Sequence, residues 1–389
     1  MSYQPYSVLV TGGCGFIGSN FINSVFQKWH MTRFVNIDKL TYGIRETNVA
    51  AEVRQSNRYK FFKGTVRDID LLLCLLRDYQ IDTIVHFAAV THVDESYIDR
   101  IGTIEENVMS TTVLLEAAAL RYNGIKRLLH ISTDEVYGES EEGSTPKVEY
   151  SLLNPTNPYS ASKACCEMIL KAYWHSYKIP FVMVRINNIY GPKQTLSKLI
   201  PKFISLAVEG KPYPLMGDGM HTRSWIYVDD CTDAIRRVCE IGRIGEIYNI
   251  GTEFEITNYD VTMLIHQTGE QLSVVYLAKA GVLFQRVLYL PFRALLLRKP
   301  VGLGMDFNCL RLNSLTSDVN AIFLVKVCRG SLEHHAEKDF RWDYINSSAL
   351  QFSAALWLMI LSHTGGLRSI QLSPVVVYYA ELLSFGLCG

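Results

Sequence analysis

The sequence predicts an α/β protein with a doubly wound parallel sheet and a smaller C-terminal domain. Two observations support this prediction. Short apolar runs alternate with segments of helical length through the first half of the chain, as expected when helices cover both faces of a parallel sheet. A glycine-rich turn also stands directly after the first apolar run and before the first helical segment.

The alternating segments can be assigned in chain order. The first strand is expected at Ser7–Thr11, a fully apolar run except at its ends, and the first helix at Gly18–Lys28. Helices of apolar periodicity are expected at Asn107–Leu120 and Ser162–Tyr177. Further short apolar runs predict strands at Phe34–Asp38, Tyr59–Lys63, Thr83–Phe87, Arg127–Ser132 and Phe181–Arg185.

Bulk composition places few limits on function. The chain has 389 residues, and its 38 basic residues equal its 38 acidic residues, so the net charge gives no sign of nucleic acid or membrane partners. Nine cysteines are scattered without metal-ligand spacing, and we expect reduced thiols in a cytoplasmic protein. The N-terminus lacks a basic segment followed by a long apolar run, so we expect no signal peptide.

The composition divides the chain into three parts. We expect the sheet domain over residues 1–185, with later segments contributing, and substrate-domain elements over 186–268. Residues 269–389 form an atypical tail, because residues 270–389 contain only 8 of the 38 acidic residues. Its apolar run Ala349–Leu361 is too short to span a bilayer. The tail is interpreted either as a buried part of the domain or as sequence that is not a native continuation of the chain before it.

The glycine-rich turn predicts a dinucleotide site. Gly12, Gly15 and Gly18 give the spacing needed for a tight turn, close approach of a pyrophosphate and packing of helix on strand. Phe16 and Ile17 would open the helix whose N–H groups face that pyrophosphate. The turn therefore predicts a Rossmann cofactor site, against the alternative of a glycine-rich turn without a ligand.

Asp38, at the end of the second predicted strand, indicates which dinucleotide binds. A carboxylate there accepts hydrogen bonds from the adenosine ribose hydroxyls and repels a 2′-phosphate. This favours NAD over NADP. The alternative is a strand-end aspartate that only caps the next turn.

Tyr159 and Lys163 form a Tyr-x-x-x-Lys pair on one face of a predicted helix. A lysine ammonium so placed, together with the positive nicotinamide ring, is expected to lower the pKa of the tyrosine, which then acts as a base near neutral pH. Thr133, Asp134 and Glu135 follow the strand Arg127–Ser132, at the sheet edge where ligands bind in open α/β folds. Different surroundings can divide the two carboxyls into an acid and a base, and the alternative is a solvated acidic turn.

These residues together resemble the extended short-chain dehydrogenase/reductase family, and specifically its dTDP-glucose and UDP-glucose 4,6-dehydratases. The resemblance runs from about Ser7 to about Thr257. It is carried by Thr11–Gly18, Asp38–Tyr42, His86–Asp94, Thr133–Gly138, Asn157–Lys163, Asn188–Pro192, Lys198–Lys202 and Tyr248–Gly251. Similar epimerases have Ser and small residues at the Thr-Asp-Glu run, and similar decarboxylases lack the Asp. Asp134 with Glu135 therefore points to dehydration.

The resemblance implies a mechanism for this chain. Tyr159 would take the proton of the sugar O4 as NAD⁺ accepts the C4 hydride, assisted by Thr133 and Lys163. Glu135 would then remove the C5 proton while Asp134 protonates the leaving C6 hydroxyl. The hydride would finally return to C6, giving a 4-keto-6-deoxy sugar.

The resemblance also implies binding residues and a partner. A nucleotide-diphosphate sugar would contact His92, Asn188, Lys198, Leu199, Arg223 and Asn249, and the cofactor would contact Thr65 and Ala88. Arg223 would pair with the diphosphate, with a surface ion pair as its alternative, and Asn249 has a structural alternative in closing its turn. Relatives pair through two long helices, so a homodimer is expected.

Two departures from the family keep an alternative open. Gly64-Thr65-Val66 stands where relatives have an aspartate that contacts adenine, and the late segment that binds the nucleotide in relatives is not recognisable. The alternative to a dehydratase is a non-catalytic or impaired NAD-binding homologue. Within the same class, an epimerase or decarboxylase is the runner-up, and Asp134 disfavours both.

Overall fold

The computed structural model describes residues 3–41, 44–91, 93–120, 124–139, 145–252 and 254–273. A seven-stranded sheet in the order β3-β2-β1-β4-β5-β6-β9 forms its centre, and every pair of neighbouring strands is parallel. The strands are β1 (Ser7–Thr11), β2 (Arg33–Asp38), β3 (Tyr59–Lys63), β4 (Thr83–His86), β5 (Arg127–Thr133), β6 (Phe181–Ile186) and β9 (Ile247–Ile250). The predicted doubly wound fold and its six predicted strands are confirmed, with ends that shift by one residue at most.

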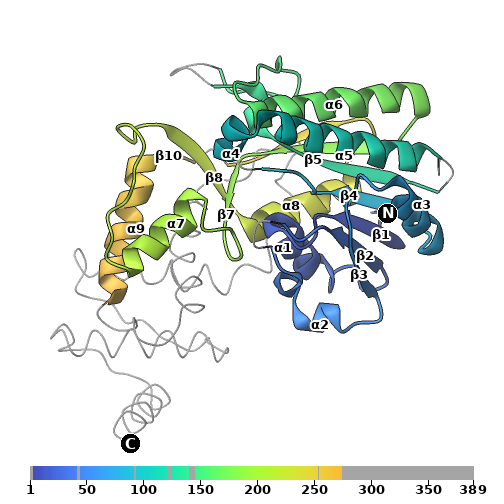
Figure 1. The fold of residues 1–389 in the computed structure, drawn as a ribbon, viewed down its shortest axis with the longest axis horizontal. Helices are drawn as coiled ribbons and strands as arrows, with labels where there is room; N and C mark the ends of the chain where they lie inside the picture. Colours follow the sequence, from blue (N-terminus) through green and yellow to red (C-terminus); the bar gives the residue numbers. More distant parts are fainter. Residues whose placement is uncertain are drawn as a thin grey trace, which may run out of the picture. The chain divides into compact units, whose positions relative to one another are not determined.

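Helices cover both faces of this sheet (Figure 1). On one face, α3 (Ile69–Asp78), α5 (Arg100–Leu120) and α6 (Pro158–Tyr177) pack their apolar side chains on strands β1, β2, β4 and β5. The short helices α2 (Ala51–Arg54) and α4 (Val93–Ile98) and the 3₁₀ turns Glu46–Asn48 and Asp134–Tyr137 connect the larger elements. α5 and α6 lie side by side in Figure 1.

The three predicted helices are present with different starts. α1 (Phe16–Val25) begins two residues before its predicted start and ends before Lys28. α5 begins at Arg100 rather than Asn107. α6 begins at Pro158 because Asn157 caps it, and its side chain accepts the Ser160 backbone N–H at 2.8 Å. Proline suits the first helical position because its missing N–H would have no partner there.

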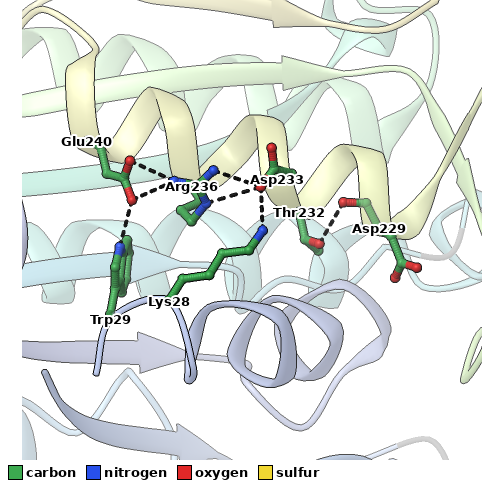
Figure 2. A network of polar contacts seen from close by, with 7 residues as sticks. All are labelled: Lys28, Trp29, Asp229, Thr232, Asp233, Arg236 and Glu240. Atoms are coloured by element: carbon green, nitrogen blue, oxygen red, sulfur yellow. Dashed lines mark hydrogen bonds and ion pairs between the residues drawn. The ribbon is translucent and has the colours of Figure 1, made fainter. Parts of the chain in front are cut away.

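The other face of the sheet is covered by α1 and α8 (Val228–Ile241), which come from opposite ends of the described chain. Figure 2 shows the polar contacts that join them. Arg236 on α8 pairs with both Asp233 and Glu240, and these two carboxylates hold the end of α1: Lys28 donates to Asp233 at 2.6 Å and Trp29 to Glu240 at 2.8 Å. Residues after 185 thus complete the large sheet domain.

The remaining elements form a smaller layer. β10 (Glu255–Thr257), β8 (Thr222–Tyr227) and β7 (Asn188–Tyr190) make a three-stranded sheet, antiparallel between β10 and β8 and parallel between β8 and β7. α7 (Leu199–Val208) and α9 (Asn258–Ser273) pack together, and a second apolar core joins them to the strands. Among the residues just described, no helix is long and apolar enough to cross a membrane.

The predicted tail cannot be compared with this fold. Residues 274–389 lie outside the described residues, and the run Ala349–Leu361 is among them. Only the end of α9 reaches past residue 268.

Candidate active site

The glycine-rich turn between β1 and α1 has the shape that a bound pyrophosphate needs. Gly12 has a φ of +68°, and a Cβ on it would lie 2.7 Å from the backbone N of Ala88. Gly15 stands at the N-cap of α1 with no side chain in the way, so the first N–H groups of that helix face outward. Phe16 and Ile17 follow as the first half-buried residues of α1. The turn therefore fits a dinucleotide phosphate.

Asp38 lies beside this turn at the end of β2. Its carboxylate accepts the backbone N–H of Cys14 at 3.0 Å and of Leu40 at 2.8 Å, and only 7% of the residue is exposed. Burial nevertheless raises the pKa of Asp38. Each of its oxygens keeps a further lone pair, which fits hydrogen bonds from ribose hydroxyls. This geometry is compatible with the predicted contact to a ribose.

The two remaining predicted cofactor residues lie at the same edge of the sheet. Thr65 follows β3, and its hydroxyl accepts the Arg67 N–H at 3.2 Å. Ala88 follows β4 and donates its N–H to Thr11 at 3.3 Å. A cavity of about 260 Å³ has Lys39, the residue after Asp38, in its lining. It is lined by Lys39, Thr41, Arg67, Val90, Thr103 and Glu106, among others, and by none of the predicted catalytic side chains.

Thr133, Asp134 and Glu135 stand at the carboxyl end of β5, where the chain turns into a single 3₁₀ turn. The Thr133 hydroxyl donates to the Asp134 carboxyl at 3.2 Å and accepts the Glu135 N–H at 3.2 Å. The Glu135 carboxyl accepts the Asn157 amide at 3.0 Å. Because Asn157 caps α6, this contact ties the acidic turn to the helix that carries Tyr159.

The two carboxyls have different hydrogen-bond partners, the Thr133 hydroxyl for Asp134 and the Asn157 amide for Glu135. The carboxyl of Asp134 is half-buried, and its pKa is raised to about 7 by burial and by the neighbouring Glu135 charge. The positive charge of Arg223 lowers the pKa of Asp134. Arg223, a predicted substrate residue, is therefore within electrostatic range of the acidic turn. A carboxyl with a pKa near 7 is suited to donate a proton at neutral pH.

Tyr159 and Lys163 occupy one buried face of α6, with 8% and 4% of each residue exposed. The Lys163 amine donates to the Ile131 carbonyl at 2.7 Å, and burial lowers its pKa. The expected lowering of the tyrosine pKa by Lys163 is wrong for this structure. Burial and the charges of Glu135 and Asp134 raise the pKa of Tyr159 above its ordinary value.

The predicted substrate residues are only partly brought together. Arg223 is exposed on β8, Asn188 begins β7, and Leu199 begins α7. Lys198 reaches the loop after β4, where its amine donates to the Thr91 carbonyl at 3.0 Å. His92 lies outside the described residues. Asn249 accepts from the Tyr137 hydroxyl at 2.8 Å, a contact that supports its structural alternative.

A buried ion pair next to the site was missed by the sequence analysis. Arg185 on β6 and Glu167 on α6 are 1% and 0% exposed at their side chains, and they are joined by two hydrogen bonds of 2.6 and 3.0 Å. Glu167 also accepts the Ser132 hydroxyl at 2.6 Å, and Arg185 donates to the Tyr137 hydroxyl at 2.7 Å. The signal was available, because Glu167 continues the i, i+4 series that Tyr159 and Lys163 begin.

Comparison with known proteins agrees with this arrangement. Residues 8–251 match the NAD dependent epimerase/dehydratase family, and the chain belongs to that family. This membership confirms the cofactor that the glycine turn and Asp38 predict.

The resemblance to 4,6-dehydratases is confirmed as well. The chain is 40% identical to dTDP-D-glucose 4,6-dehydratase of Dictyostelium discoideum, over 66% of this chain and 61% of that protein. It is 39% identical to dTDP-glucose 4,6-dehydratase of Haemophilus influenzae, over 69% and 80% of the two chains. A trifunctional UDP-glucose 4,6-dehydratase/epimerase/reductase of Arabidopsis thaliana is 44% identical, and the matched region is 39% of its length. The chain therefore spans 39% of the length of the Arabidopsis protein and 61% of the length of the Dictyostelium protein.

Solved structures give the same result. The dTDP-glucose 4,6-dehydratase of Streptomyces venezuelae, solved with NAD and TYD bound, has a TM-score of 0.64 and 39% identity over 67% of this chain and 80% of that one. A UDP-glucose 4-epimerase of Thermotoga maritima has a TM-score of 0.62 and 25% identity over 68% and 82%. The fold is therefore shared by both activities, and residues of the site have to distinguish them.

Proposed function

We propose that this chain is a nucleotide-sugar 4,6-dehydratase that converts dTDP-glucose or UDP-glucose to the 4-keto-6-deoxy sugar. One observation carries the proposal. Two carboxyls with different surroundings, Asp134 and Glu135, adjoin Tyr159 at the carboxyl end of β5. Elimination of water across C5 and C6 needs one acid and one base beside an oxidised C4, and these two groups supply them.

Each residue has a separate task in this proposal. NAD⁺, when bound, supplies the hydride acceptor that C4 needs. Tyr159 takes the O4 proton, and Thr133 holds the O4 oxygen in reach of that tyrosine. Glu135, fixed by Asn157, takes the C5 proton, and Asp134 gives a proton to the departing O6. Lys163 holds α6 against the end of β5 through the Ile131 carbonyl.

The diphosphate of the substrate would bind the cations outside this cluster. Arg223 lies near Asp134 on the exposed side of β8, and Lys198 stands at the start of α7. A guanidinium binds a diphosphate oxygen pair with two hydrogen bonds, so Arg223 is the stronger anchor. Asn188 and Leu199 adjoin these cations in the chain, and His92 stays a sequence prediction.

Incubation of the full chain with NAD⁺ and each nucleotide sugar tests the proposal. A 4-keto-6-deoxy product is expected from at least one sugar, detected by its alkali-induced absorbance. Asp134→Asn and Glu135→Gln should each reduce turnover by about 100-fold or more, because a positioned acid or base contributes that much. The exposed Asp78→Asn is the control and should leave turnover unchanged.

Other outcomes would select the alternatives. Bound NAD without any 4-keto product would support the non-catalytic homologue. A product that differs from the substrate only in the configuration of C4 would support an epimerase.

We also propose that the chain forms a homodimer through α5 and α6. Ile101, Ile104 and Met109 of α5 are 80%, 41% and 40% exposed, and Ile101 and Ile104 share one helix face because they stand three residues apart. Met168 and Tyr177 of α6 are 49% and 53% exposed. An apolar face on two neighbouring helices suits a four-helix contact between two copies. The cytoplasmic location stays a prediction from the cysteine pattern.

A further inference from the structure

Two cations lie next to the residue that is expected to bind the cofactor ribose. Asp38 ends β2, the position at which a Rossmann fold binds the ribose hydroxyls of its dinucleotide. Lys39 follows it directly, and Arg67 follows β3, the strand that pairs with β2. Both cations line the cavity of about 260 Å³. A cation near the ribose is the feature that accommodates the 2′-phosphate of NADP in Rossmann folds, so this chain combines the carboxylate of an NAD site with cations suited to NADP.

Two glutamates of α5 pair with these cations. Lys39 donates from Nζ to Oε1 of Glu106 at 2.5 Å, and the Ser110 hydroxyl donates to the same oxygen at 3.3 Å. Arg67 donates to Glu105 at 2.8 Å and lies 3.6 Å from the other carboxylate oxygen of Glu106. The Glu106 side chain is 19% exposed and that of Glu105 is 54% exposed, so solvent screens the pair of Glu106 with Lys39 less.

The charge of Lys39 also acts on Asp38. Both carboxylate oxygens of Asp38 accept a backbone N–H, one from Cys14 and one from Leu40. Burial raises the pKa of Asp38, and the charge of Lys39 is among the effects that oppose this rise, so the ammonium lies within electrostatic range of the carboxyl. An unpaired Lys39 would therefore offset the repulsion between Asp38 and a 2′-phosphate.

We propose that Glu106 selects NAD over NADP by pairing with Lys39 and withholding its ammonium from a ribose 2′-phosphate. A phosphate with about two negative charges would have to displace the Glu106 carboxylate from Lys39 or lie beside it, and both raise the free energy of binding. The 2′-hydroxyl of NAD is neutral and meets neither cost. This inference goes beyond the proposed dehydratase function, because it holds for any reaction that the bound dinucleotide serves.

Competition between the two dinucleotides measures this selection without a sugar substrate. Equilibrium dialysis of the full chain against known mixtures of NAD⁺ and NADP⁺, followed by chromatography of the bound dinucleotides, gives the ratio of the two Kd values. We expect the wild type to bind NADP⁺ at least about 100-fold more weakly than NAD⁺. Glu106→Gln keeps the shape of the side chain and removes its charge, and it should reduce that ratio about tenfold.

Melting temperatures show which dinucleotide is responsible for the change. A ligand that binds the folded chain more tightly raises the melting temperature further. In Glu106→Gln, the rise caused by NADP⁺ should therefore grow, whereas the rise caused by NAD⁺ should match that of the wild type. A melting temperature close to the wild-type value without added dinucleotide would show that the variant folds.

A second substitution tests whether Glu106 acts through Lys39. In a Lys39→Met background, Glu106→Gln should change the Kd ratio less than about threefold, because no ammonium is left to release. Glu116→Gln is the matched control. It removes the same charge about 15 Å further along α5, beyond the screening length, and still offers an oxygen to the Tyr173 hydroxyl. Its Kd ratio should equal that of the wild type.

Four results would overturn the inference. They are a wild-type Kd ratio near one, an unchanged ratio in Glu106→Gln, a change that lies only in NAD⁺ binding, and an equal tenfold change in the Lys39→Met background. The last would mean that Glu106 repels the phosphate directly. All four leave the 4-keto product of the wild type unaffected, and absence of that product would instead contradict the proposed function.

Discussion

At the scale of single residues, the burial that suits Asp134 to its proposed role as an acid also makes the fold less stable when Asp134 is ionised. Its pKa of about 7 in the fold lies above its ordinary value of 3.8, so the folded state binds the proton more tightly than the unfolded state does. This contribution to stability is complete below about pH 3.8 and is lost as the pH rises through about 7. Above neutral pH, the ionised carboxyl therefore opposes folding.

Asp134→Asn should stabilise the protein at pH 8 and have little effect at pH 4. The rise in the pKa of Asp134 corresponds to about 2 kcal/mol of unfolding free energy, a value that we reduced because the residue is only half-buried. Denaturant unfolding at the two pH values measures it. The control is Asp78→Asn, since Arg77 lowers the pKa of that exposed carboxyl and its removal has the opposite sign. An equal effect of Asp134→Asn at both pH values would contradict the assignment.

The same residue sets the alkaline limb of the activity profile. As the proposed acid, Asp134 must carry its proton before it can protonate the departing O6. We therefore expect kcat/KM to fall about tenfold per pH unit well above pH 7, while NAD stays bound. The profile is measured with the assay for the 4-keto product over pH 5 to 9, a range chosen around that pKa. A constant kcat/KM across pH 7 to 9 would contradict this role.

At the scale of elements, α6 determines how the site is held together. Tyr159, Lys163 and Glu167 follow each other at i, i+4 and i+8, so one buried face of this helix carries both the chemistry and the anchor to β6. The acidic turn after β5 is held at both of its ends, by Asn157 at Glu135 and by Arg185 at Tyr137.

Removal of one partner of the Glu167–Arg185 pair should be strongly destabilising. Arg185→Met leaves the carboxyl of Glu167 buried without its partner, and a loss of about 3–5 kcal/mol in unfolding free energy is expected. Chemical denaturation measures the loss. Arg77→Met is the matched control, since its pair with Asp78 is more than half exposed and should contribute less than about 1 kcal/mol. Similar losses in the two variants would contradict the importance of burial.

The sequence was sufficient to predict strands and motifs whose residue pattern is local. It was insufficient to predict interactions that form only when residues from different elements are buried together. Strands such as Ser7–Thr11 and motifs such as Tyr159–Lys163 are read from neighbouring residues, and the structure reproduces them. The direction of the Tyr159 pKa shift was wrong because the charges that raise it, Asp134 and Glu135, approach it only in the folded chain. The i, i+4 series places Glu167 on the same helix face as Tyr159, but its pairing with Arg185 was missed because the two residues belong to different elements.

At the scale of the whole molecule, the proposed dimer adds a test that does not depend on catalysis. Ile101→Glu places a charge in the exposed apolar face of α5, where a second copy would bury it, so the variant should sediment at half the mass of the wild type. Leu152→Glu is the control, because that residue is 90% exposed and belongs to neither helix. A wild type that sediments as a monomer would contradict the dimer.

The place of β9 at the edge of the large sheet has a consequence for the synthesis of this protein. β9 pairs with β6, a strand whose six residues are all buried, yet about sixty residues separate the two along the chain. While the ribosome adds those residues, β6 stays an open apolar edge that another nascent chain can pair with. Chains that stop before Ile250 should therefore aggregate, and the interval between translating β6 and translating β9 is when this protein depends most on chaperones.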